Sequence, residues 1–323
     1  MVPAGEKLPL PLEGIRVLDA THIVAGPFCS MILADMGAEV IKIERPHTGD
    51  LARSRGPFIK AEDGREMSSR FLGVNRNKKS VSIDLRNPRC KTAFEELVRN
   101  SDVLVDNWGS GAFRRLGLGY DRLSEINPGL VYASITGYGD SEGLSGPYSD
   151  WPANNLSIQA MSGWMEITGD PDGPPQSVGD NIGDSIPGVW TALGIVLALE
   201  TKRKTGKGQY VDMAMYECMV SHIESNMNSF QATGANPGRS RESVWPPRAS
   251  PSAPRTATWC WPEYGLRNGC ASCGRWWAGR TYWKATPGIL LDRAWTASST
   301  RTTSFRPSKG GRPRSLNSRW RRH

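Results

Sequence analysis

The segment from residue 169 to residue 188 carries the strongest candidate for a reactive side chain. It is rich in glycine, proline and aspartate, and it runs into an apolar segment, Val189 to Leu199, with the spacing of a helix. Its last acid, Asp184, is therefore expected in a glycine-bracketed turn at the start of that helix. Backbone N–H groups and the positive end of a helix are able to hold a carboxylate ionised and to stabilise an oxyanion formed from it. The alternative is that Asp184 only caps the helix and that the glycines only form turns.

Strands and helices alternate over the first part of the chain. Short β-branched runs predict strands, and apolar residues at helical spacing predict helices. The predicted order is strand 12–19, helix 28–36, strand 38–44, strand 80–85, helix 88–99, strand 102–106 and strand 130–135. Such alternation predicts an α/β fold with a parallel sheet covered by helices, in which ligands bind at the carboxyl ends of the strands.

Cationic, amide and aromatic side chains follow these strand ends. A ligand with phosphates and an adenine ring needs several cations, some backbone donors and an aromatic face, and the residues after these strands supply all three. Gly26 would let the first loop approach such a ligand closely. The side chains are Arg45, Lys78, Asn107, Trp108, Arg114 and Arg115. The alternatives are that the cations are solvated surface charges and that Trp108 is a core residue. Neither a Walker A motif nor a GxGxxG fingerprint is present, which disfavours a redox dinucleotide.

These features together resemble the class III coenzyme A transferase family of the CaiB/BaiF type. The resemblance spans about Leu10 to Phe230 in ordered blocks, one of which holds Pro174-Pro175, Gly179, Asp184 and Gly188. It implies a Rossmann-like large domain and transfer of coenzyme A from an acyl-CoA thioester to a carboxylic acid. It also implies that Asp184 is the catalytic nucleophile, which forms first a mixed anhydride and then an enzyme-CoA thioester. By the same resemblance coenzyme A is held by Ile23, Val24, Ala25, Arg45, Lys78, Asn107, Trp108 and Arg115.

Three departures from the family pattern bear on the substrate. Val24 stands where some members have a glutamine, and Thr136 where some have a lysine, so the acyl group need not be formyl. Members that racemise 2-methylacyl-CoA esters are expected to carry a histidine where this chain has Asn154-Asn155. An amide cannot shuttle a proton at neutral pH, so racemisation is the less favoured activity. The four histidines form no spaced cluster, and we expect no metal.

The charge of the chain divides it into two regions. Residues 1–238 hold 23 basic and 29 acidic side chains, whereas residues 239–323 hold 17 basic and 3 acidic ones, together with 8 of the 12 tryptophans. We therefore expect a large domain over residues 10–238 and an atypical tail over residues 239–323, disordered or translated out of frame. The alternative is a nucleic-acid-binding extension. A zinc site at Cys270 and Cys273, with Cys260 upstream, is disfavoured because no second CxxC or paired histidine follows. Loss of the second, small domain of the family would leave a weakly active or inactive CoA-binding fragment.

The remaining expectations concern location and assembly. The first residues lack the pattern of a signal peptide, and no run approaches 18 consecutive apolar residues, so we expect no membrane span. Cys29, Cys90 and Cys218 show no pairing pattern, which fits a reduced cytoplasmic location. The family resemblance implies a homodimer.

Overall fold

A six-stranded parallel sheet organises the protein. The computed structural model describes residues 8–141 and 146–239, and these lie in one of two compact units, Met1–Ala249. The sheet has the order β5-β2-β1-β6-β7-β8. Its strands are β1 (Arg16–Ala20), β2 (Glu39–Glu44), β5 (Lys78–Ser82), β6 (Val103–Asp106), β7 (Val131–Thr136) and β8 (Tyr210–Ala214). The strand order reverses direction between β1 and β6, so a crevice is expected at the carboxyl ends of these two strands.

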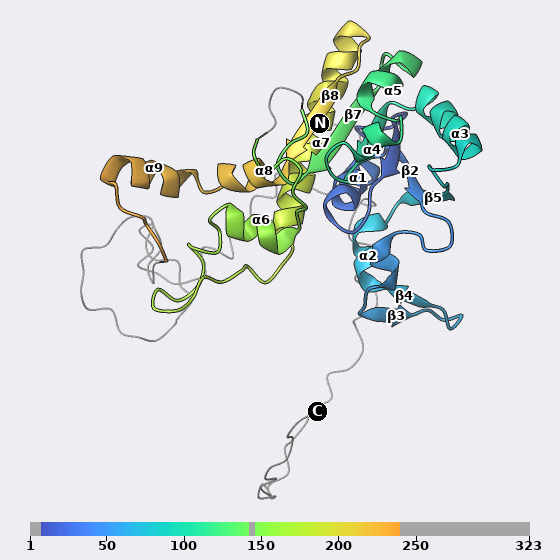
Figure 1. Cartoon of the computed structure of the whole chain (residues 1–323). Coiled ribbons are helices and arrows are strands. Elements are labelled where there is room, and N and C mark those ends of the chain that lie inside the picture. The colour runs from blue at the N-terminus through green and yellow to red at the C-terminus, as the bar shows by residue number, and fades with distance from the viewer. Residues whose placement is uncertain (1–7, 142–145, 240–323) are drawn as a thin grey trace, which may run out of the picture. The chain divides into compact units, whose positions relative to one another are not determined.

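Helices cover both faces of this sheet (Figure 1). One face carries α1 (Ala25–Asp35) and α7 (Ile182–Thr205), with α6 (Asn155–Met161) and α8 (Met215–Ser221) packed on α7. The other face carries α3 (Pro88–Arg99), α4 (Ala112–Arg115) and α5 (Tyr120–Ile126). The remaining elements are the short helix η1 (Leu51–Ser54), the hairpin β3 (Phe58–Lys60) and β4 (Glu66–Ser68), and the helices α2 (Ser69–Asn75) and α9 (Glu224–Thr233).

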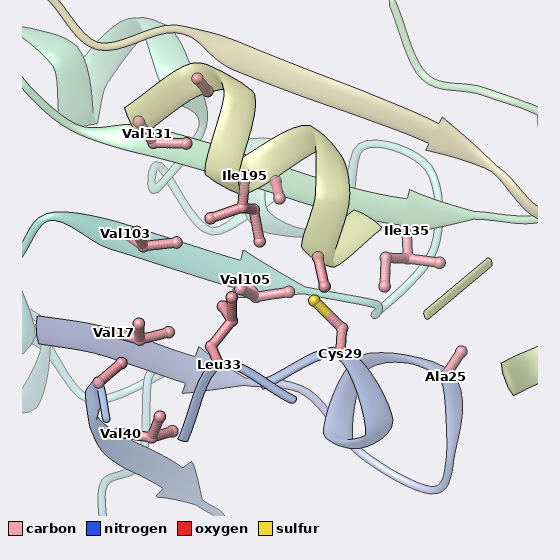
Figure 2. Packing of buried hydrophobic residues seen from close by; sticks show 14 of the residues in the cluster. Val17, Ala25, Cys29, Leu33, Val40, Val103, Val105, Val131, Ile135 and Ile195 are labelled. Carbon is pink, nitrogen blue, oxygen red and sulfur yellow. The ribbon is translucent and has the colours of Figure 1, made fainter. Parts of the chain in front are cut away.

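Alternate strand residues feed two separate hydrophobic cores, as the pleat of a strand requires. Val17, Val103 and Val105 face α1 and α7, and Figure 2 shows them with Leu33 and Ile195 from those helices. Their strand neighbours Leu18, Ala20 and Leu104 face α3, α4 and α5 instead. Both faces of the central strands are thus buried, which is why these runs are apolar at nearly every position.

The predicted α/β fold with a parallel sheet is confirmed. The predicted helix 88–99 coincides with α3, which begins with Pro88 behind the capping side chain of Asn87. The helix predicted at 189–199 is longer than expected, because α7 begins at Ile182 and includes Pro187. The first loop is shorter than expected, because α1 begins at Ala25. The predicted tail, apart from its first residue, and the question of a second domain lie outside the described residues.

Helix α7 is apolar on two faces, and packing within the described residues accounts for only one of them. By length and composition it could cross a membrane, with a mean hydropathy of 1.6 in its most apolar window. One face, which includes Ala192, Ile195 and Ala198, is buried against α1 and the sheet. The opposite face exposes large apolar side chains, namely Val189, Trp190, Leu193, Val196 and Leu197.

Candidate active site

A cleft of about 950 Å³ opens at the carboxyl ends of β1 and β6, where the strand order reverses. The loop after β1 lines it with Ile23, Val24 and Ala25, and the loop after β6 lines it with Asn107 and Trp108. Asp184, from the first turn of α7, lines the same cleft. The fold therefore brings six of the nine predicted site residues to one cavity.

The Asp184 carboxylate is mostly buried and has no side-chain hydrogen bond or ion pair within the described residues. Burial raises the pKa of Asp184 from its ordinary 3.8 to about 6. The side chain is therefore ionised for the most part at pH 7, although burial works against the ionised form. Asp184 is not the helix cap, since Asn181 occupies that position.

Two close contacts place Asp184 in the cleft. Gly188 lies one turn after Asp184 on the same side of α7, and a Cβ atom on Gly188 would stand 2.8 Å from the carbonyl oxygen of Ala25. This glycine allows α7 to approach the start of α1, so Asp184 comes to lie beside the loop after β1. At the other side, a Cβ atom on Gly183 would meet the carbonyl oxygen of Asn155 at 2.7 Å.

Two amide side chains of α6 hold the segment that leads into α7. The Asn155 Oδ1 atom accepts hydrogen bonds from the Gly183 N–H (2.9 Å) and from Gln159 Nε2 (2.9 Å). The Gln159 Oε1 atom accepts from the Val178 N–H (2.9 Å), and the Gln159 side chain is fully buried. These amides replace the capping side chain that Asn181 does not supply, so they fix the start of α7 and the position of Asp184.

The loop after β1 has a strained conformation. Ile23 has a φ of +70°, which a β-branched residue adopts at a cost of about 1–3 kcal/mol. The Asn107 side chain bridges the two strand ends, because its Oδ1 accepts from the His22 N–H (2.9 Å) and its Nδ2 donates to the His22 carbonyl (2.9 Å). No described residue accepts a hydrogen bond from the N–H groups of Val24, the N-cap residue of α1, and of Ala25, its first residue. They are free to meet a ligand in the cleft.

Trp108 and Arg45 form a second part of the site. The indole Nε1 of Trp108 donates to the Ala20 carbonyl (2.6 Å), and the ring packs edge-on against Phe113 at 5.2 Å between centroids. The Arg45 guanidinium lies 5.2 Å from the centre of the Trp108 ring, and both residues line a small hollow beside the cleft. Trp108 thus borders the core and the cavity together, so both interpretations of this residue hold in part. His22 lines both hollows, and burial lowers its pKa.

Lys78 lies apart from the cleft, which corrects its predicted role. Its Nζ atom donates to Asp19 Oδ2 (2.9 Å), to the Pro27 carbonyl (2.8 Å) and to Asn75 Oδ1 (2.8 Å). All three donors of the ammonium are occupied inside the protein, and only 2% of the side chain is exposed. Lys78 therefore belongs to a buried charge network, and we do not include it among the residues that hold coenzyme A.

Arg115 is exposed and lies just outside the cleft. Its guanidinium donates to the Ser110 carbonyl (3.0 Å), and Ser110 lines the cleft.

The residues that depart from the family pattern all lie in the wall of the cleft. They are Val24, Thr136, Asn154 and Asn155. Within residues 8–141 and 146–239 there is no group of three or more His, Cys, Asp or Glu side chains arranged to hold a metal.

Sequence reasoning missed several residues of this site. Arg55 and Arg70 lie on the wall of the cleft that holds Asp184. They come from the segments around the β3–β4 hairpin, which no strand prediction covered. The sequence predicted no role for Asn155 beyond the absence of a histidine at this place. It gave no signal for Asp50, which is buried beneath the loop after β1. None of these positions carries a motif, so only the fold reveals them.

The chain matches the CoA-transferase family III model over residues 12–252. It is 44% identical over 228 residues to a succinyl-CoA:mesaconate CoA-transferase of Haloarcula hispanica, a match over 71% of this chain and 57% of the relative. It is 40% identical over 230 residues to an acetyl-CoA:oxalate CoA-transferase of Acetobacter aceti, over 71% and 57% of the two chains. This chain therefore spans less than two thirds of the length of these relatives.

A solved structure has a similar fold. The CAIB/BAIF family protein of Brucella suis superposes with a TM-score of 0.68 at 37% sequence identity. The superposition covers 72% of this chain and 60% of that one. The parallel sheet with its helices thus matches the fold of that CAIB/BAIF family protein.

Proposed function

The chain belongs to CoA-transferase family III, and from this premise we propose that it moves coenzyme A from an acyl-CoA thioester to a carboxylic acid, with Asp184 as nucleophile. One observation carries the proposal. Asp184 presents a carboxylate that has no hydrogen bond or ion pair among residues 8–141 and 146–239, in a cleft lined also by Trp108 and by two backbone N–H groups with no acceptor in these ranges. A desolvated, partnerless carboxylate is costly to maintain, and such groups concentrate at reactive sites.

The proposed reaction proceeds by four balanced acyl transfers. The Asp184 carboxylate attacks the donor thioester, which gives a mixed anhydride and the CoA thiolate. The thiolate attacks the Asp184 carbonyl of the anhydride, which releases the donor acid and leaves an enzyme-CoA thioester. The acceptor carboxylate attacks this thioester to form a second anhydride, and the thiolate then attacks the acceptor acyl carbon and frees Asp184. Because CoA stays bound throughout, each step is effectively intramolecular.

We assign coenzyme A to the loops after β1, β2 and β6. The backbone of Ile23, Val24 and Ala25 would face the thioester end, beside Asp184. The pair formed by Arg45 and Trp108 offers a cation and an aromatic face side by side, which suits a phosphate and a base. Asn107 supports this arrangement through its two hydrogen bonds to the His22 backbone. The guanidinium of Arg115, which donates to the carbonyl of the cleft residue Ser110, would serve the phosphates.

We propose a dicarboxylic acid as the acceptor. The two relatives are named for mesaconate and oxalate, which are both dicarboxylic acids. In this chain Arg55 and Arg70 line the cleft that holds Asp184. Within the described residues the Arg55 guanidinium makes no hydrogen bond or ion pair, and Arg70 uses only its Nε, which donates to the Gly56 carbonyl (2.8 Å). Guanidinium groups bind carboxylates through two parallel hydrogen bonds, so these residues suit the second carboxylate of the acceptor.

The decisive experiment is intact mass spectrometry of the purified full chain before and after incubation with a panel of acyl-CoA donors that includes succinyl-CoA. We expect a mass gain equal to CoA less water, mapped to Asp184 and discharged by hydroxylamine. The Asp184→Asn variant should show no adduct, whereas Asp180→Asn, a change of an exposed acid four residues earlier, should retain it. Absence of an adduct with every donor would overturn the transferase proposal and favour a CoA-binding fragment without turnover. Exchange of the 2-proton of a branched acyl-CoA with deuterated solvent would instead identify a racemase.

A further inference from the structure

We propose that Asp50 is a positioning residue, which holds Ile23 in its left-handed backbone conformation and so fixes the part of the cleft wall that lies beside Asp184. The catalytic consequence rests on the proposed function, whereas the coupling between Asp50 and Ile23 is a property of the fold alone. Among the described residues, the Asp50 carboxylate bonds to the cleft wall only through the backbone N–H groups of Ile23 and Ala52. Asp50 also borders the small hollow that Arg45 and Trp108 line, but it is almost fully buried there. We therefore expect it to act through the loop and not on the substrate.

Asp50 makes its contacts from a buried position, with 3% of the residue exposed. Its Oδ1 atom accepts from the Ile23 N–H (3.0 Å) and from the Ala52 N–H (2.8 Å). Its own N–H donates to Glu44 Oε2 (2.8 Å). The carboxylate is thus held from the end of β2 and the start of η1, and it is rigid enough to fix a loop that follows β1.

A buried lysine completes the arrangement. The Lys42 Nζ atom lies 2.9 Å from Asp50 Oδ2, an ion pair without the geometry of a hydrogen bond, and it donates to the Thr21 carbonyl (3.0 Å). Lys42 and Asp50 therefore hold the chain on both sides of His22: the cation takes the carbonyl of Thr21 and the anion takes the N–H of Ile23. Lys42 is 1% exposed, so this pair is shielded from solvent and from salt.

The same ion pair extends to a second carboxylate. Asp19 Oδ2 lies 3.7 Å from Lys42 Nζ and 2.9 Å from Lys78 Nζ. Burial alone would raise the pKa of Asp19, but the two ammonium groups hold it well below its usual range. Asp19 Oδ1 accepts from the Thr21 N–H (3.0 Å), so this network fixes both polar backbone groups of Thr21 and the N–H of Ile23.

The network stabilises an unfavourable backbone conformation at Ile23. A β-branched residue leaves a φ near +70° unless its surroundings enforce it, and glycine would occupy the same conformation at no steric cost. If Ile23 relaxed, the backbone of Val24 and Ala25, which lines the cleft, would shift with it. The hydrogen bond from Ile23 to Asp50 is therefore the contact that keeps the ligand-facing backbone in place.

The test measures free coenzyme A affinity by calorimetry and unfolding free energy by urea denaturation on the full chain. The variants are Asp50→Ala, which removes all its contacts, and Asp50→Asn, which retains the Oδ1 acceptor and loses the ion pair. Ile23→Gly removes the strain, and Ile23→Ala is its matched control, because alanine shortens the side chain but keeps the strain. Each Ile23 variant is also combined with Asp50→Ala.

We expect Asp50→Ala to bind CoA about tenfold more weakly than Asp50→Asn does, and addition of Ile23→Gly to restore affinity to within about threefold. Ile23→Ala should not restore it. In the unfolding equilibrium constant, Asp50→Ala and Ile23→Gly should be coupled by about tenfold, or about 1.4 kcal/mol.

Equal affinities of the two Asp50 variants, or equal rescue by glycine and alanine, would overturn the proposal. If the wild type binds no CoA, the proposed function fails, and the coupling in unfolding then decides on Asp50 alone. If Asp50→Ala does not fold, the unfolding comparison moves to Asp50→Asn: glycine should be more stable than alanine at position 23 in both backgrounds, and equal stability would overturn the proposal.

Discussion

Replacement of Asp184 by asparagine should stabilise the folded protein at neutral pH while it abolishes transfer. The Asp184 carboxyl is mostly buried and has no partner in the part of the chain that the structure describes, and burial raises its pKa to about 6. The protonated form is thus favoured in the folded state. The stability that this group contributes is fully present below about pH 4 and is lost as the pH rises through about 6. Above that pH the wild type carries a cost that the neutral asparagine does not.

The size of this cost follows from the two pKa values. The difference between 3.8 and about 6 corresponds to about 3 kcal/mol at 1.36 kcal/mol per tenfold. Because the side chain lines an open cleft, screening reduces this ceiling, and we expect about 1–2 kcal/mol. Urea unfolding at pH 8 should show Asp184→Asn more stable than wild type by this amount. At pH 5 the advantage should fall to about half, because the wild-type carboxyl is then mostly protonated in the folded state.

The control is Asp180→Asn, since Asp180 precedes the same helix but is exposed. This variant should show no pH-dependent gain. An Asp184→Asn variant that is less stable than wild type at pH 8, or that shows the same difference at both pH values, would refute the reasoning. It would mean that the carboxylate has a stabilising partner in solution.

Three other predictions concern the chemistry and the assembly. The rate of adduct formation should fall as the pH is lowered, with an apparent pKa near 6 instead of near 4, because only ionised Asp184 attacks the thioester. Stopped-flow measurements from pH 4.5 to 8 test this, and a rate that stays constant down to pH 5 would contradict it. Arg55→Met should raise the KM for dicarboxylic acceptors about tenfold and leave that for acetate unchanged, as steady-state assays can show, whereas Arg65→Met, in the exposed β3–β4 hairpin, should change neither. If the family homodimer forms through the apolar face of α7, sedimentation velocity should detect a dimer that Leu193→Glu with Leu197→Glu dissociates; an unchanged distribution would exclude this face.

The sequence alone indicated the architecture and most of the site. The alternation of buried strands with amphipathic helices predicted a parallel sheet, because both signals are local and periodic. The glycine-rich segment marked Asp184, and the residues after the strands marked the loops that meet in the cleft. Five of the predicted residues reach that cavity because the carboxyl ends of parallel strands share one edge of the sheet, and Asp184 reaches it from the start of α7.

Only the tertiary structure decided how each charge is used. Lys78 and Arg45 are both cations near strands in the sequence, yet the Lys78 ammonium is enclosed by three acceptors and Arg45 is exposed over Trp108. The pKa of Asp184 likewise depends on burial by distant segments, and the strain at Ile23 depends on Asp50, 27 residues later. Burial and pairing are properties of long-range contacts, so no local pattern of residue types encodes them.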